Sequence, residues 1–126
     1  MIIDYEKLKK LGKEKGLNIL EALYLEDGVL GRFFPPNIIL IDPNLCETQH
    51  YTKQKKVLVL LHEICHWFKW KENHLPNEEA CFEFENICDF ILNSEIYGDY
   101  EAIKRLNLKE PMKFLNEVIE KCAAVN

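Results

Sequence analysis

A His-Glu-x-x-His motif follows an apolar segment near the middle of the chain. Residues 57–61 are wholly apolar, and His62, Glu63 and His66 come directly after them. On an α-helix, His62 and His66 lie one turn apart on the same face and can direct their imidazoles at one point. Glu63 points about 100° round the helix, near enough to contact a water molecule at that point. Two imidazoles and an adjacent carboxylate are what a hydrolytic Zn²⁺ site requires.

The apolar surroundings of the motif favour a common partner for its three polar groups. A buried polar group without a partner costs a few kcal/mol. A bound metal ion would satisfy both histidines, and the glutamate stands at the one position that the chemistry needs. The alternative is a pair of core histidines that chance has placed four residues apart.

A second helix, predicted over residues 78–96, offers the third metal ligand. Its apolar face contains Cys81, Phe84, Ile87, Cys88, Ile91 and Leu92. Glu85 falls within this face, where a carboxylate needs a cation or hydrogen bonds. We therefore predict a site made of His62, His66 and Glu85, with Glu78 near the same edge as the reserve candidate. The alternative to a metal ligand is that Glu85 lies at the edge of this apolar face and reaches water.

The composition excludes several classes of protein. The chain has 126 residues and a hydrophobic fraction of 48%, which indicate one domain, residues 1–126. Its formal charge of −5 argues against a surface that binds the phosphates of nucleic acid. Its amino terminus does not resemble a signal peptide, and its apolar runs are too short to cross a membrane. Its five cysteines form an odd set without a Cys-x-x-Cys motif, which favours a reducing cytoplasm.

The sequence predicts an α+β fold in which a small three-stranded antiparallel sheet packs on helices. A first helix is expected over residues 4–15, with Asp4 as its N-cap and Gly16 as its terminator. Strands are expected over residues 18–25, 29–34 and 38–41. Thr52 can cap the motif helix, which should end near Trp70. A helical turn or two is then expected at 100–106, and residues 107–111 open a last amphipathic helix.

These features resemble the ImmA/IrrE-type zinc metallopeptidases of bacteria, phages and integrative elements. The resemblance covers residues 28–92 and rests on Ile-Ile-Leu-Ile-Asp-Pro-Asn-Leu at 38–45, on the His62–His66 motif and on Glu-Asn-Ile-Cys-Asp-Phe at 85–90. It implies a zincin core, zinc ligands at His62, His66 and Glu85, and Glu63 as the general base. It also implies a protein substrate, such as a helix-turn-helix repressor of a mobile element. The chain departs from the family in a shorter loop between the ligand helices and in the lack of Leu-Met-Pro after Leu92.

We therefore expect a zinc-dependent endopeptidase in which Glu63 takes a proton from the attacking water and passes it to the leaving amine. An extended substrate could pair with residues 38–41 or 29–34. Asp89 could orient a ligand histidine. Tyr97, Tyr100 and His74 are candidates for an oxyanion donor.

Two other functions remain open at this stage. A non-catalytic zinc-binding domain could act through protein contacts alone. A Spartan-like protease would use His74 as its third ligand, although His74 lies in a polar loop and the chain lacks a basic DNA-binding surface.

Overall fold

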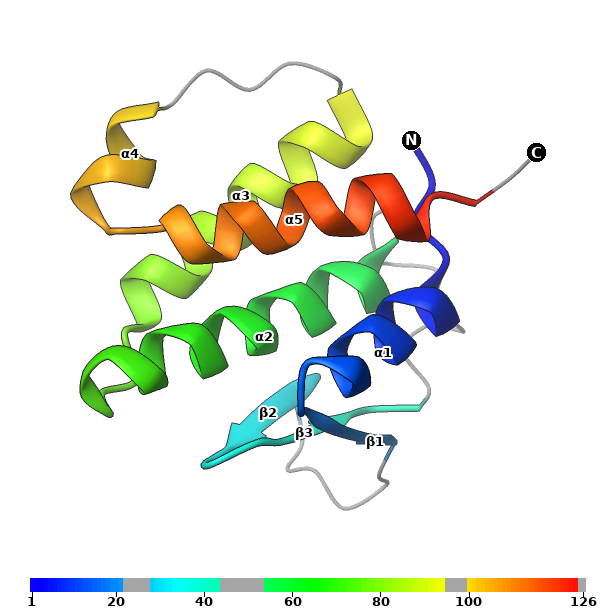
Figure 1. The fold of residues 1–126 in the computed structure, drawn as a ribbon, viewed down its shortest axis with the longest axis horizontal. Helices are drawn as coiled ribbons and strands as arrows, with labels where there is room; N and C mark the ends of the chain where they lie inside the picture. Colours follow the sequence, from blue (N-terminus) through cyan, green and yellow to red (C-terminus); the bar gives the residue numbers. More distant parts are fainter. Residues whose placement is uncertain (22–27, 44–53, 95–99, 125–126) are drawn as a thin grey trace.

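The computed structural model describes residues 1–21, 28–43, 54–94 and 100–124, and in these residues five helices accompany a three-stranded sheet. The elements are α1 (Tyr5–Glu14), β1 (Asn18–Glu21), β2 (Gly31–Phe34), β3 (Ile38–Ile41), α2 (Lys55–Asn73), α3 (Glu78–Ser94), α4 (Tyr100–Arg105) and α5 (Lys109–Cys122). The sheet lies on one side of α2, and α3 and α5 lie on the other (Figure 1). The α+β class is confirmed.

Helix α2 carries the motif and is covered on both sides. It contacts β2 and β3 below and α3 and α5 above. Every residue from Val57 to Trp67 is buried, which explains why this segment is apolar almost all round. The helix runs to Asn73, beyond the predicted end near Trp70. Its N-cap is Gln54, whereas the predicted cap Thr52 lies outside the described residues.

The sheet has the strand order β1-β3-β2. The strands β2 and β3 pair in the predicted antiparallel way, but β1 and β3 are parallel, so the prediction of a purely antiparallel sheet was wrong. The reason lies in burial, since β3 is the most apolar strand and takes the central position. Its Ile39 and Ile41 are completely buried against α2.

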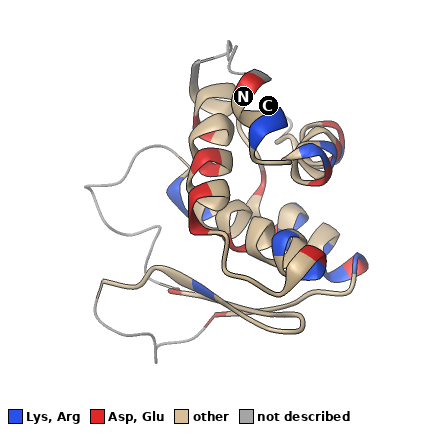
Figure 2. Ribbon diagram, turned by 90° about the vertical axis from the view of Figure 1, so that its left-hand side faces the viewer, with Lys and Arg blue, Asp and Glu red and all other residues tan. Residues whose placement is uncertain are grey.

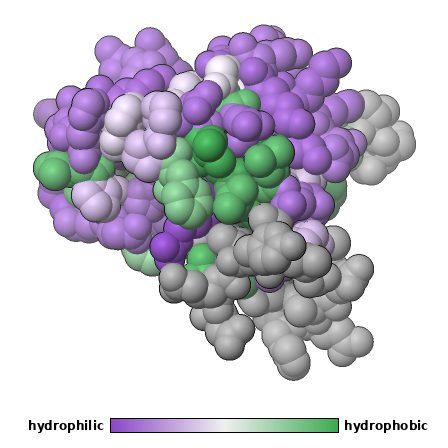
Figure 3. All heavy atoms as spheres, turned by 90° about the horizontal axis from the view of Figure 1, so that it is seen from below, coloured by the Kyte–Doolittle hydropathy of each residue, from purple (hydrophilic) through white to green (hydrophobic). Residues whose placement is uncertain are grey.

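The two faces of the sheet differ in what covers them. The inner face approaches α2 so closely that a Cβ atom added to Gly31 would lie 2.7 Å from Cγ1 of Val59. On the outer face, Leu20 and Phe34 have exposed fractions of 46% and 40%. Figure 3 shows apolar residues gathered on the side of the molecule that is seen from below. The small residue at position 31 therefore sets how close β2 comes to the motif helix.

The remaining helices follow the predicted pattern. The side chain of Asp4 caps α1 by accepting a hydrogen bond from the Lys7 amide at 3.1 Å, and Gly16 follows the helix with a φ of 108°. The apolar face of α5 packs inward through residues that include Phe114 and Val118. Among the described residues, no helix combines the length and the apolar character that crossing a membrane requires.

A buried lysine joins α2 to the segment between α4 and α5. Lys69 is 4% exposed, and its Nζ donates to the carbonyls of Leu106 at 3.0 Å and Asn107 at 3.1 Å. Its Nζ also lies 2.8 Å from a carboxylate oxygen of Glu72. These carbonyls directly follow α4, so a positive charge here also suits the carbonyl end of that helix.

We expect Lys69→Met to lower the free energy of unfolding by about 1–3 kcal/mol, because two carbonyls lose their donor. Urea unfolding followed by circular dichroism measures the change. Lys113→Met is the control, since Lys113 is exposed and its contact with Glu110 is 3.5 Å long. Equal stability of the two variants would contradict a structural role for Lys69.

Candidate metal centre

The motif helix brings His62, Glu63 and His66 together as the spacing predicts. One ligand atom from each residue lies within 4.8 Å of the others, and the two imidazole centroids are 5.0 Å apart. The three residues are between 7% and 8% exposed. This cluster could hold a metal ion.

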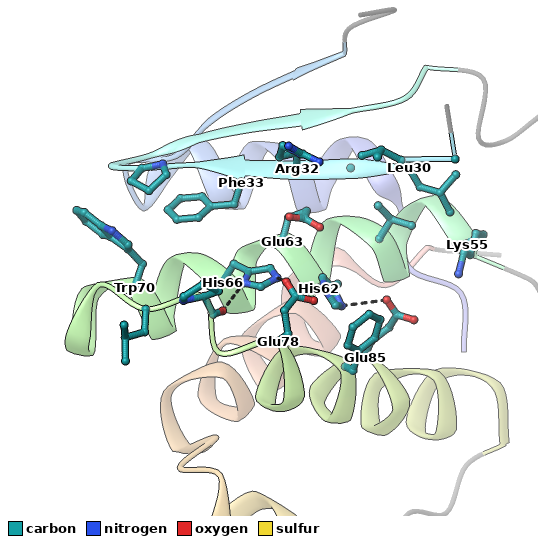
Figure 4. A pocket seen from close by; sticks show the side chains of 18 of the residues that line it. Leu30, Arg32, Phe33, Lys55, His62, Glu63, His66, Trp70, Glu78 and Glu85 are labelled. Carbon is teal, nitrogen blue, oxygen red and sulfur yellow. Dashed lines mark hydrogen bonds and ion pairs between the residues drawn. The ribbon is translucent and has the colours of Figure 1, made fainter. Parts of the chain in front are cut away.

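The cluster faces a cavity of about 640 Å³ between β2, α2 and α3 (Figure 4). The aromatic rings of Phe33 and Trp70 lie at one end, in edge-to-face contact at 6.3 Å, and Lys55 lies at the other. Glu63 lies on the β2 side of the cavity, while Glu78 and Glu85 enter from α3. The polar centre is therefore reached through a cavity that is large enough for part of a peptide.

His66 is held from both sides of its ring. Its Nδ1 lies 2.7 Å from the carbonyl oxygen of Pro76, and its Nε2 lies 2.8 Å from Oε1 of Glu78. A carbonyl oxygen only accepts hydrogen bonds, so Nδ1 must carry the proton in that contact. The carboxylate of Glu78 is likewise an acceptor, so its contact pairs with a proton on Nε2. A metal ion that took the place of this proton would find the ring already fixed by the carbonyl at Nδ1, as in a metal-ligating histidine.

His62 is less completely satisfied. Its Nδ1 lies 3.2 Å from Oε1 of Glu85, within ion-pair distance, but the two groups are not aligned as a hydrogen bond. No other partner reaches this buried nitrogen within the described part of the chain. The ring of Phe82 covers His62 with the two centroids 4.9 Å apart. A buried imidazole beside a carboxylate, without an aligned hydrogen bond, fits a centre that a cation completes.

The electrostatics of the centre are dominated by carboxylates. Burial raises the pKa of Glu63, although His62 and His66 partly oppose this. Burial would also raise the pKa of Glu85, but its contact with His62 prevails and the net pKa is lowered. Conversely, burial lowers the pKa of His62, yet the nearby carboxylates outweigh it and the net pKa is raised.

Figure 2 shows further acidic residues along α3, the helix that carries Glu78 and Glu85. Together with Glu63, these two give three carboxylates around two imidazoles. A cation suits this excess of negative charge.

The structure brings some of the other predicted residues to the centre and leaves others away from it. Glu85 and Glu78 both reach a motif histidine. His74 lines the cavity, but its ring is exposed and stacks on Trp70 at 4.3 Å, so the structure gives no support to His74 as a ligand. Asp89, expected to orient a histidine, instead accepts a hydrogen bond from Asn93.

Two residues proposed as oxyanion donors are not placed. Tyr97 and the side chain of Tyr100 lie outside the described part. The sequence analysis missed one contact of the site, the one between the carbonyl oxygen of Pro76 and Nδ1 of His66. A backbone group carries no sequence signal, although a proline shortly after the motif helix marks a turn back towards it.

No protein-family model matches the sequence, and no curated protein or solved structure matches the chain. The resemblance to the ImmA/IrrE-type peptidases therefore stays a prediction from the motifs. The arrangement of the side chains supports a metal centre independently of that resemblance.

We expect the metal-free protein to be stabilised by Zn²⁺ through His62 and His66. At a free zinc concentration of 100 times the Kd, the gain is about 2.7 kcal/mol, because the ion binds the folded state. Thermal unfolding with zinc and with a chelator measures it. The double variant His62→Ala/His66→Ala should lose the gain, and the control His74→Ala should keep it. A gain that survives in the double variant would place the metal elsewhere.

Proposed function

We propose that the protein is a zinc-dependent endopeptidase. The observation that carries this proposal is the position of Glu63, whose carboxylate is buried beside His62 and His66 at the floor of the cavity. A purely structural metal site does not need an additional carboxylate of this kind. Hydrolysis needs one, because a base must take the proton of the attacking water.

The residues present fit a zinc ion. His62 and His66 supply two nitrogen ligands, and a glutamate of α3 supplies the third, with Glu85 expected from the sequence. When bound, the ion lowers the pKa of a water molecule to about 7 and polarises the substrate carbonyl.

Glu63 is suited to moving the proton. Its pKa is raised by burial, which brings the carboxylate closer to the range in which a base works near neutral pH. Its side chain lies against β2, with Cγ 3.3 Å from the position that a Cβ atom on Gly31 would take. In the proposed reaction Glu63 accepts the proton of water and returns it to the leaving amine.

The edge of β2 can position an extended substrate. The amide of Asp42 donates to the carbonyl of Leu30 at 2.9 Å, so the backbone N–H and C=O groups of Leu30 face β3. Successive residues of an antiparallel strand direct these backbone groups to alternate edges, so those of Arg32 and Phe34 also face β3. Those of Gly31 and Phe33 then point to the other edge, above the cavity. Of the two segments expected to bind a peptide, residues 38–41 cannot do so, because β3 is paired on both sides. We assign this role to β2.

The proposed substrate is a specific protein, such as a helix-turn-helix repressor of a mobile element. This part of the proposal comes from the resemblance to the ImmA/IrrE-type peptidases. The formal charge of −5 and the carboxylates around the cavity disfavour direct binding of nucleic acid by this surface. The same charge distribution disfavours a Spartan-like protease.

The decisive test replaces the proposed base. We expect Glu63→Gln to bind zinc stoichiometrically but to cleave peptides about 10²–10⁴-fold more slowly, because the amide cannot accept the proton. Casein and a peptide library, each with zinc-loaded and chelated protein, provide the activity assay, and atomic emission measures the zinc. The control Glu120→Gln changes an exposed glutamate of α5 and should cleave like the wild type.

Two outcomes would contradict the proposal. Undiminished cleavage by Glu63→Gln would exclude Glu63 as the base. Zinc-loaded wild type that cleaves none of these substrates would favour the non-catalytic zinc-binding domain instead.

A further inference from the structure

Helices α2 and α3 form an antiparallel pair in which two glutamates meet two different histidines. Glu78 lies against His66, and Glu85 lies against His62. The two glutamates are seven residues apart on α3, which corresponds to about 10.5 Å along a helix axis. As they lie in the structure, the two carboxylates therefore contact different histidines, and each is placed for a different role.

The contacts of His66 decide at which end the ion binds. Its Nδ1 is engaged by the carbonyl of Pro76 at 2.7 Å, so Nε2 is the nitrogen left for a metal. The atom next to Nε2 is Oε1 of Glu78, at 2.8 Å. An ion bound by His66 thus lies at the Glu78 end of the cluster.

His62 must then turn the opposite nitrogen to the ion. Its Nδ1 faces Glu85, further along α3 and away from Glu78. This leaves Nε2 as the ligating nitrogen of His62. Glu85, 3.2 Å from Nδ1, is the carboxylate that can accept from Nδ1–H once a bound ion aligns the ring. The carboxylate of Glu85 is also the less exposed of the two, at 23% against 56% for Glu78, as suits a group that supports a ligand from behind.

We propose that Glu85 is a positioning residue that holds His62 through Nδ1, and that Glu78 supplies the third ligand. This inference rests on the proposed zinc site and reverses the roles expected from the sequence. A carboxylate behind a ligating histidine fixes its tautomer and ring orientation and makes the ligating nitrogen more basic.

Zinc affinity, measured by competition with a chromophoric chelator, separates the two roles. We expect Glu85→Ala to bind zinc about 10–100-fold more weakly, as is usual when such a supporting group is lost. Glu85→Gln should recover most of the affinity, because its carboxamide oxygen still accepts a hydrogen bond from Nδ1–H. Glu78→Gln should lose far more, as we also expect for His66→Ala, because a neutral amide replaces an anionic ligand.

The cobalt-substituted protein provides a spectroscopic signature that a merely structural role would not move. Glu78→Gln should change the visible absorption bands of bound Co²⁺, and Glu85→Gln should leave them as in the wild type. Glu79→Gln is the matched control, since Glu79 is next to Glu78 but forms an exposed contact with Arg105 at 3.1 Å. Urea unfolding of each variant in chelator establishes that it is folded.

Two outcomes would overturn the proposal and make Glu85 the ligand. One is a greater loss of zinc affinity in Glu85→Gln than in Glu78→Gln, and the other is a cobalt spectrum that changes in Glu85→Gln alone. Hydrolysis is not measured, so a protein that binds zinc without cleaving peptides can still confirm these roles while the endopeptidase proposal fails. A wild type that binds neither zinc nor cobalt would overturn both.

Discussion

The burial of two imidazoles and a carboxylate on a helix covered from both sides is the constraint on which the site depends. A buried polar group without a partner costs a few kcal/mol, and a whole domain is stable by only about 5–15 kcal/mol. Helix α2 therefore tolerates these residues only because neighbouring elements supply partners. The loop before α3 gives a carbonyl to His66, and α3 gives a carboxylate to each histidine. These contacts still leave an excess of negative charge, which a bound divalent cation would balance.

The features that the sequence predicted correctly are those set by local geometry. Residues four apart on a helix share a face whatever surrounds them, so the convergence of His62 and His66 follows once residues 57–66 are helical. The wholly apolar run before the motif indicated that this helix is buried on every side. Asp4 and Gly16 likewise delimit α1 through contacts and dihedral angles within a few residues.

The features that the sequence could not predict depend on contacts between distant segments. A helical wheel places Glu85 on the inner face of α3, but it does not show which histidine lies at that height. That depends on how α3 packs against α2. The start of α2 also depends on a distant segment. The side chain of Gln54 accepts a hydrogen bond from the amide of Ile3 at 2.6 Å and donates one to the carbonyl of Met1 at 2.8 Å. The N-cap thus ties down the amino terminus, and no local capping pattern indicates this.

The central position of β3 in the sheet also depends on contacts between distant segments. Consecutive strands suggested a simple antiparallel arrangement, yet the isoleucine-rich strand is inserted between β1 and β2 because it can bury Ile39 and Ile41 completely. This topology has a consequence for the site. It places β2 at the edge of the sheet that lines the cavity, on the side of Glu63.

The close approach of β2 to α2 links the fold to the chemistry. Gly31 permits this approach, since a Cβ atom there would meet Val59 at 2.7 Å and Cγ of Glu63 at 3.3 Å. A larger residue at position 31 would push the strand away from the helix and from the side chain of Glu63. The strand that would hold a substrate and the residue that would activate water are thus fixed by one packing contact. The proposed peptide hydrolysis would require the two to be held at a constant separation, which this contact would provide.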